Sequence, residues 1–97
     1  MIKRVIVRSR AKRDIREAKQ WYHNISPELG ADFLAAVDEA ILLAQKYPLA
    51  FSLMHRTFRR VLVRRFPYAL FYQRDSDSII IVAVLHQARD PELLGKL

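Results

Sequence analysis

The chain has 97 residues, of which 52% are hydrophobic, so we expect one folded domain over residues 1–97 and no second domain. It contains no cysteine, which excludes disulfides, thiolate zinc sites and a cysteine nucleophile. Seventeen lysines and arginines against ten acids give a formal charge of +7, which predicts an acidic partner, either nucleic acid or an acidic protein segment.

The first predicted element is a short β-rich run from Ile2 to Val7, followed by Ser9, a residue suited to capping a helix. Charged residues follow Met1 closely, and no apolar run reaches 18 residues. We therefore expect neither a signal peptide nor a transmembrane span, and a cytoplasmic protein that does not enter a membrane.

Two amphipathic helices follow. The first has apolar residues at helical spacing from Ala11 to Ile25, with charged residues between them. Ser26-Pro27 supplies an N-cap and a first-turn proline for the second helix, whose apolar stripe runs from Leu29 to Ala44 and stops at Tyr47-Pro48. Because the connection is short, the two helices should form an antiparallel hairpin.

The segment from Pro48 to Arg56 shows no clear period and is predicted to be the longest loop. Several of its residues are apolar, namely Leu49, Phe51, Leu53 and Met54. The loop should therefore pack against the domain instead of extending into solvent.

Residues 59–72, RRVLVRRFPYALFY, place four arginines among apolar and aromatic residues. Read with period 2, they predict two strands that meet at Phe66-Pro67. One face carries Arg60, Leu62 and Arg64, and the other carries Val61, Val63 and Arg65. Guanidinium groups lose solvation on burial, so arginines on both faces indicate solvent, acidic side chains or phosphate nearby.

The run from Ile79 to Leu85 is apolar on both faces and predicts a strand at the centre of a sheet. Arg89-Asp90-Pro91 then predicts a capped, short C-terminal helical turn. The element order indicates an α+β fold in which an N-terminal strand and an antiparallel helical hairpin pack with a mainly antiparallel sheet. The helices cover one sheet face only, so the other is expected to be open and is a candidate binding groove.

His86 is the titratable residue of most interest for catalysis, because it ends the strand predicted to be most buried. Beside Arg60, Arg64 or Arg65 it could act on a phosphodiester, with the histidine moving the proton and the guanidinium holding the phosphate charge. The commoner alternative is a strand-end histidine bonded to a carbonyl or to Asp90. The other two histidines, in a helix end and a loop, have no partner at metal spacing, so we expect no metal and no cofactor.

The aromatic residues allow two interpretations. Tyr22 fits the apolar stripe, whereas its neighbour Trp21 either packs at the edge of the helical hairpin or forms an exposed partner site. Tyr68, Leu70 and Tyr72 share one strand face, which favours core and leaves base stacking as the alternative.

Four stretches carry a family resemblance. They are AKRDIREAKQWY at 11–22, Leu29-Gly30 with Phe33-Leu34, RVLVRRFPYALFY at 60–72 and VAVLHQARDP at 82–91. In this order, and over nearly the whole chain, they resemble the RelE/ParE superfamily of bacterial toxins from type II toxin-antitoxin modules. The resemblance is closer to the ParE-like branch.

The resemblance implies a growth-inhibiting toxin that forms a hetero-oligomer with a cognate antitoxin, whose acidic, amphipathic C-terminal segment wraps it. In the ParE-like branch the implied target is DNA gyrase, which is poisoned without hydrolytic chemistry by the toxin. In the RelE-like branch the toxin is a metal-independent endoribonuclease that cuts messenger RNA in the ribosome. That branch often uses a tyrosine near the C-terminus, and no tyrosine follows His86 here.

We therefore expect a gyrase-poisoning binding protein, with ribosome-dependent mRNA cleavage as the alternative. The candidate catalytic residues of a ribonuclease are His86, Arg60, Arg65 and Arg89. The candidate partner-binding residues are Arg59, Arg60, Arg64, Arg65, Trp21, Tyr68 and Tyr72.

Overall fold

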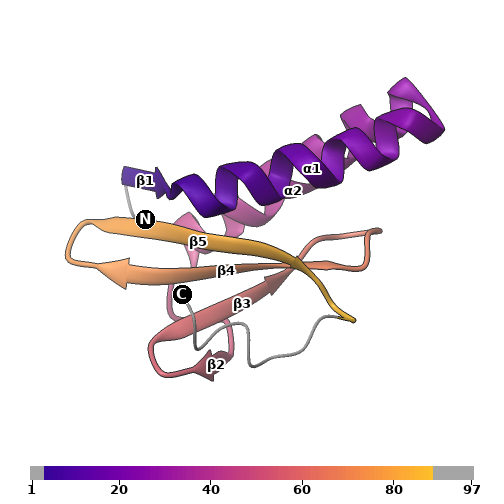
Figure 1. The fold of residues 1–97 in the computed structure, drawn as a ribbon. Helices are drawn as coiled ribbons and strands as arrows, with labels where there is room; N and C mark the ends of the chain where they lie inside the picture. The colour runs from indigo at the N-terminus through magenta and orange to yellow at the C-terminus, as the bar shows by residue number, and fades with distance from the viewer. Residues whose placement is uncertain (1–3, 89–97) are drawn as a thin grey trace.

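Two helices lie side by side on one face of a five-stranded sheet in the computed structural model, which describes residues 4–88 (Figure 1). In chain order the elements are β1 (Arg4–Val7), α1 (Ser9–Ile25), α2 (Pro27–Lys46), β2 (Leu53–His55), β3 (Phe58–Leu62), β4 (Tyr68–Asp75) and β5 (Ser78–His86). The predicted α+β class and helical hairpin are confirmed. The predicted C-terminal helical turn lies outside the described residues.

The sheet has the strand order β1-β5-β4-β3-β2. β1 runs parallel to β5, and every other pairing is antiparallel. The parallel pair requires a crossover, which α1 and α2 provide. β5 has a strand on each side, as its doubly apolar sequence requires, although β4 and not β5 is the middle strand of the five.

The start of α2 follows the sequence closely. Ser26 is its N-cap, and the Ser26 Oγ accepts a hydrogen bond of 3.1 Å from the Leu29 N–H. Pro27 occupies the first turn, where its missing N–H leaves no bond unmade. The expected cap of α1 is wrong, because the helix begins at Ser9 itself and its N-cap residue, Arg8, makes no side-chain capping bond.

The main core lies between the helices and the sheet. Its largest buried side chains are Tyr72, Phe33, Leu70, Ile79, Ile81, Val37 and Val84. Near the β3–β4 turn, Tyr22 packs edge-on against Phe66 with ring centroids 4.8 Å apart, and Phe33 meets Tyr68 at 5.3 Å. Burial, followed by the proximity of Tyr68, raises the pKa of Tyr22.

The segment expected to be a loop contains β2, which pairs with β3 through Leu53 and Arg59. A register irregularity interrupts the pairing between Leu53 and His55. A strand of three residues is too short to display a period of 2, so the sequence pattern could not reveal it.

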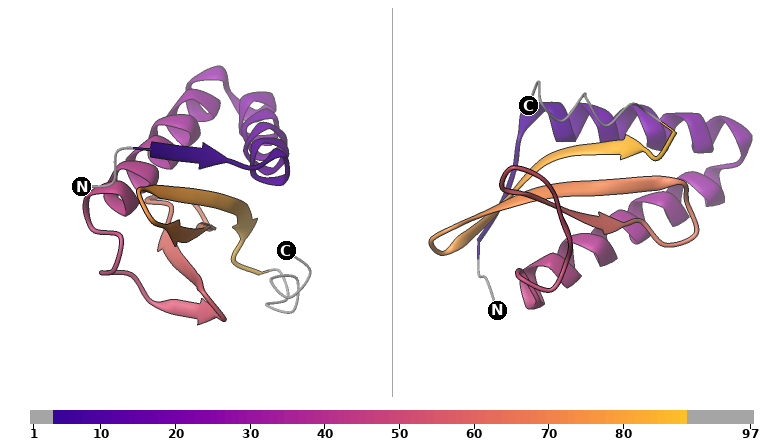
Figure 2. Two further views of the ribbon diagram at one scale, coloured as in Figure 1. Left: turned by 90° about the vertical axis from the view of Figure 1, so that its left-hand side faces the viewer. Right: turned by 90° about the horizontal axis from the view of Figure 1, so that it is seen from below.

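The sheet face away from the helices is not the open groove that the sequence predicts. A second buried cluster lies there, 0% to 7% exposed, made of Phe58, Ala69, Phe71, Val82, Ala83 and Leu85. Figure 2 shows both helices on the opposite side of the sheet, and within residues 4–88 no helix covers this cluster. β4 and β5 thus carry buried apolar residues on both faces of the sheet, and this second face is not open.

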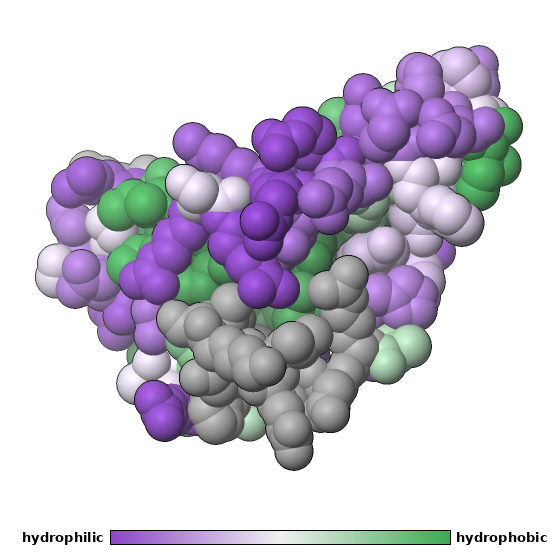
Figure 3. Space-filling view, viewed as in Figure 1, coloured by the Kyte–Doolittle hydropathy of each residue, from purple (hydrophilic) through white to green (hydrophobic). Residues whose placement is uncertain are grey.

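The outward side of α1 is largely hydrophilic, as the space-filling view shows (Figure 3). Three of its cations, Lys12, Arg13 and Arg16, are exposed. Within the described residues, no helix is long and apolar enough to cross a membrane.

Candidate functional site

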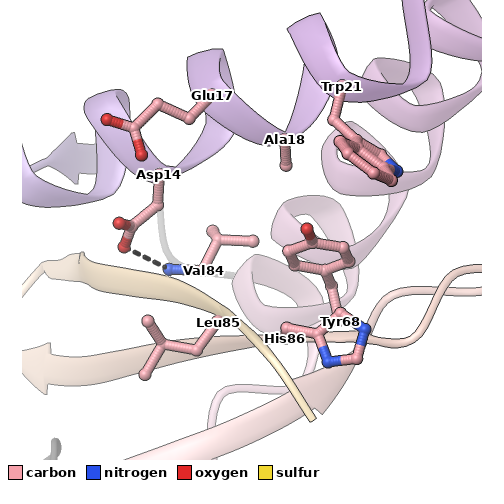
Figure 4. A pocket seen from close by; sticks show the side chains of 8 residues that line it. All are labelled: Asp14, Glu17, Ala18, Trp21, Tyr68, Val84, Leu85 and His86. Carbon is pink, nitrogen blue, oxygen red and sulfur yellow. Dashed lines mark hydrogen bonds between the residues drawn. The ribbon is translucent and has the colours of Figure 1, made fainter. Parts of the chain in front are cut away.

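A cleft of about 160 Å³ lies between α1 and the C-terminal end of β5 (Figure 4). Its lining residues are Asp14, Glu17, Ala18, Trp21, Tyr68, Val84, Leu85 and His86. In Figure 4 the two carboxylates lie on one side, the Trp21 and Tyr68 rings lie on the other, and the small Ala18 side chain stands between them. The cleft therefore joins an acidic wall to an aromatic wall.

Asp14 ties the acidic wall to the sheet. Its Oδ2 accepts a hydrogen bond of 3.1 Å from the Val84 N–H and lies 3.6 Å from the Nε of Arg10. The Asp14 side chain is only 10% exposed. Its carboxylate is thus already engaged within the protein.

Glu17 and Trp21 are one helical turn apart on α1 and both are exposed. Trp21 is unusually exposed for a large aromatic residue, since 64% of its surface remains in contact with solvent. Within residues 4–88 neither side chain has a hydrogen-bond or ion-pair partner. The structure thus favours the interpretation of Trp21 as an exposed residue over packing at the hairpin edge.

His86 packs edge-on against Tyr68, with ring centroids 5.2 Å apart. Its Nδ1 accepts a hydrogen bond of 3.0 Å from the Ala88 N–H. A nitrogen that accepts this bond carries no proton, so the bond forms only with a neutral imidazole ring. This is the bonding pattern of a strand-end histidine, with a backbone N–H as the partner; Asp90, the other predicted partner, lies outside the described residues.

The arginines divide into three situations. Arg59 turns inward, and its Nη1 donates to the Phe51 carbonyl at 2.6 Å and to the Leu49 carbonyl at 3.4 Å. Arg60 is half-buried beside Leu62, which is 54% exposed. Arg59 therefore holds the segment before β2, while Arg60 remains at the surface of β3.

Arg64 and Arg65 lie in the turn after β3, not on opposite faces of a strand as predicted. Arg64 approaches the Glu39 carboxylate at 3.7 Å, and Arg65 approaches that of Asp32 at 3.7 Å. Arg65 has a positive φ of 73°, which ends the strand alternation that the sequence pattern assumes. Both arginines remain mostly exposed, so these ion pairs add little stability.

Two separate hollows between α2 and the segment 60–65 are lined by arginines, and we refer to them together as the α2–β3 groove. The first is lined by Asp32, Ala35, Ala36, Glu39, Arg64 and Arg65. The second is lined by Leu43, Ala50, Phe51, Ser52, Arg60, Val61 and Leu62. The α2–β3 groove therefore combines apolar side chains with three arginines and two acids, Asp32 and Glu39.

The predicted site residues fall into separate places. Trp21, Tyr68 and His86 meet in the cleft, whereas Arg60, Arg64 and Arg65 line the α2–β3 groove. Tyr72 is fully buried, and its hydroxyl donates to the Pro48 carbonyl at 2.7 Å. Arg89 lies outside the described residues.

Sequence reasoning missed Asp14 and Glu17. The available signal was their spacing, since they are the only acids of α1 and three residues apart, which puts them on one helix face. Within the described residues no three histidine or acidic side chains gather in a way that could hold a metal ion.

Comparison with known protein families and solved structures gives the following similarities. A family model described as the ParE toxin of the type II toxin-antitoxin system, parDE, matches residues 5–91. Among solved structures, the chain is similar to one titled "Chromosomal ParDE TA system from P. aeruginosa", with a TM-score of 0.76 and 15% sequence identity, over 88% of this chain and 96% of that one. At this identity the structural match shows a shared fold. No curated protein matches the chain.

Proposed function

Since the chain belongs to the ParE toxin family of type II toxin-antitoxin systems, we propose that it inhibits growth by binding DNA gyrase and is neutralised by a cognate antitoxin. The proposal assigns the toxin a binding role without bond cleavage. The antitoxin is an acidic, amphipathic segment that covers the α2–β3 groove. The site of action is the cytoplasm.

The observation that carries the antitoxin proposal is the composition of the α2–β3 groove. Exposed Leu62 offers apolar contact, while Arg60 and Arg64 offer positive charge. An amphipathic segment with acids on one side complements both. Its carboxylates would replace Glu39 and Asp32 as partners of Arg64 and Arg65, and those existing ion pairs are long and exposed.

The surroundings of His86 favour binding over RNA cleavage. A general base needs a nitrogen lone pair within reach of the ribose hydroxyl. The Nδ1 lone pair of His86 accepts from the Ala88 N–H, and in the neutral ring that makes this bond Nε2 carries the proton. The charged residues of its cleft are Asp14 and Glu17, which repel phosphate. Among the described residues, no lysine or arginine lines this cleft.

Replacing Arg60 and Arg64 together with alanine tests whether the antitoxin binds at the α2–β3 groove. Partner-facing residues at the centre of an interface contribute roughly 2 to 4 kcal/mol, so affinity for the antitoxin should fall by a factor on the order of 30 or more. Arg74→Ala, an exposed change at the far end of β4, is the matched control and should keep the parent affinity. Urea unfolding should show nearly equal stability for all three proteins. A stability loss as large as the binding loss would mean that these arginines are structural.

The target is tested by assaying purified parent protein and His86→Gln for inhibition of gyrase supercoiling and for ribosome-dependent RNA cleavage. We expect both proteins to inhibit gyrase and neither to cut RNA. A ribonuclease would instead lose cleavage by a factor on the order of 10² or more in His86→Gln, because glutamine cannot transfer the proton. Parent protein that cuts RNA and leaves gyrase untouched would overturn the proposal.

A further inference from the structure

The cleft collects negative charge on an otherwise basic helix. The seventeen residues of α1 include two acids, Asp14 and Glu17, and both line the cleft. The exposed cations Lys12, Arg13 and Arg16 line a different hollow on α1. Asp14 is paired with Arg10, so in a chain of charge +7 Glu17 is the source of unpaired negative charge in the cleft.

Glu17 is the acid that remains available. Asp14 is nearly buried and is bonded to the Val84 N–H, so it cannot turn toward a ligand without releasing that donor. Glu17 is exposed and has no partner within residues 4–88. A carboxylate of this kind can accept two parallel hydrogen bonds from a guanidinium.

The opposite wall supplies aromatic faces. Trp21 leaves 64% of its surface in solvent, and the Tyr68 ring lies beside it across the cleft from the carboxylates (Figure 4). Guanidinium groups stack on indole and phenol rings, an interaction worth more when the partners leave water. An exposed tryptophan one turn from an unpaired glutamate has the components of a guanidinium site.

The size of the cleft restricts the occupant. Its volume of about 160 Å³ is smaller than the roughly 300 Å³ at which small-molecule sites begin. The opening left by the small Ala18 side chain therefore suits one side chain of a protein. Because acidic residues would be repelled by Glu17, the acidic antitoxin segment is a poor match for it.

We infer that the cleft receives an arginine side chain of the inhibited target protein, with Glu17 binding the guanidinium and Trp21 and Tyr68 stacking on it. This inference rests on the proposed function, because it assigns the cleft to the target and the α2–β3 groove to the antitoxin. The two sites are formed by different residues, so substitutions can separate toxicity from neutralisation.

Trp21 is the only tryptophan of the chain, so its fluorescence reports directly on the cleft. The purified full chain is titrated in the millimolar range with N-acetyl-arginine amide and, separately, with the uncharged analogue N-acetyl-citrulline amide. We expect a saturating change in Trp21 emission with arginine and at least tenfold weaker binding of citrulline. Equal response to the two probes, or no response to either, would overturn the inference.

Glu17→Gln removes the charge and keeps the size at an exposed position. It should weaken arginine binding about tenfold or more, whereas Glu28→Gln, an exposed change in the first turn of α2 outside the cleft, should bind as the parent does. Unchanged arginine binding in Glu17→Gln would contradict the assigned role of this carboxylate.

Growth inhibition and antitoxin binding then test the function of the cleft. We expect Glu17→Gln to lose toxicity at least tenfold in the amount of induced protein required, with antitoxin affinity within about twofold of the parent. Parental toxicity in Glu17→Gln, or a joint loss of toxicity and antitoxin binding, would overturn the inference. A parent that inhibits growth without inhibiting gyrase would refute the proposed gyrase target only, since this growth assay and the arginine titration do not depend on which target carries the arginine.

Discussion

The Asp14 carboxylate accepts a hydrogen bond of 3.1 Å from the Val84 N–H, although 70 positions separate the two residues in the sequence. β1 pairs with β5 only as far as Ile81, so beyond that residue this edge of β5 has no neighbouring strand. The register of β4 and β5 also shifts here, since Tyr72 pairs with Ile81 and Phe71 with Ala83. Asp14 thus satisfies a donor that the sheet leaves unpaired, and in doing so fixes α1 against the end of β5.

Asp14→Ala should destabilise the protein by about 1 to 3 kcal/mol, because it leaves the part-buried Val84 N–H without its acceptor. Urea unfolding measures the loss. Asp38→Ala is the matched control, since Asp38 is exposed on α2 and has no bonded partner within residues 4–88. A loss in Asp14→Ala no larger than in Asp38→Ala would show that water satisfies the Val84 donor equally well.

Arg59→Ala should lower stability more than Arg60→Ala. The Arg59 guanidinium holds the Phe51 and Leu49 carbonyls, and hydrogen bonds from a charged donor contribute about 1.5 to 3 kcal/mol. Arg60 makes no side-chain bond within the described residues, so its replacement should cost about 0.5 kcal/mol or less. Denaturant midpoints of the two variants decide the order, and the reverse order would contradict this account of Arg59.

Tyr72→Phe should cost about 1 kcal/mol at neutral pH, because the Pro48 carbonyl loses its 2.7 Å donor. Burial raises the pKa of Tyr72 above its usual 10, and the nearby Arg59 opposes part of that shift. The folded state therefore holds the phenolic proton more tightly than the unfolded state does. Stability from this source is complete below pH 10 and declines as the pH rises through the raised pKa.

The free energy of unfolding should decline less between pH 8 and pH 11 in Tyr72→Phe than in the parent. The decline should not vanish, because burial also raises the pKa of Tyr22. Tyr47→Phe is the control, since Tyr47 is 57% exposed. If Tyr72→Phe shows the parent slope, ionisation of Tyr72 is not linked to unfolding.

Gly30→Ala should destabilise the protein although alanine is the better helix former. A Cβ at Gly30 would lie 3.0 Å from the His23 Cβ and 3.1 Å from its Cα, so α2 would have to move away from α1. The packing loss of about 1 to 3 kcal/mol should exceed the helix-propensity gain of about 1 kcal/mol. Ala31→Gly, at the exposed neighbouring position, measures the propensity contribution alone. A more stable Gly30→Ala would mean that the helices can separate freely.

The elements with a long, regular pattern could be predicted from the sequence. Both helices, the Ser26 cap and the apolar β5 follow from local spacing and local bonds, which a single sequence displays. β2 could not be found, because three residues are too few for a period. The second buried cluster was misjudged, since counting helices shows which face they cover and not how apolar side chains pack on the other.

The candidate sites were predicted less well than the fold. The period-2 pattern treats Arg64 as a strand residue, but the chain leaves the strand before it and Arg65 takes a positive φ. The sequence suggested that His86 could lie beside arginines. The fold places it beside Tyr68 in a cleft with Asp14 and Glu17. Which residues share a cleft depends on how α1 lies across β5, a long-range relationship that local periodicity does not encode.

The parallel pairing of β1 with β5 has a consequence for synthesis in the cell. Arg4 aligns with Ser78 and Val7 with Ile81, so β1 cannot pair with β5 until most of the chain has been translated. The helical hairpin can form early, but β1 remains unpaired until β5 emerges from the ribosome. The cleft lined by α1 and the end of β5 is likewise absent from the nascent chain until this last strand has been made.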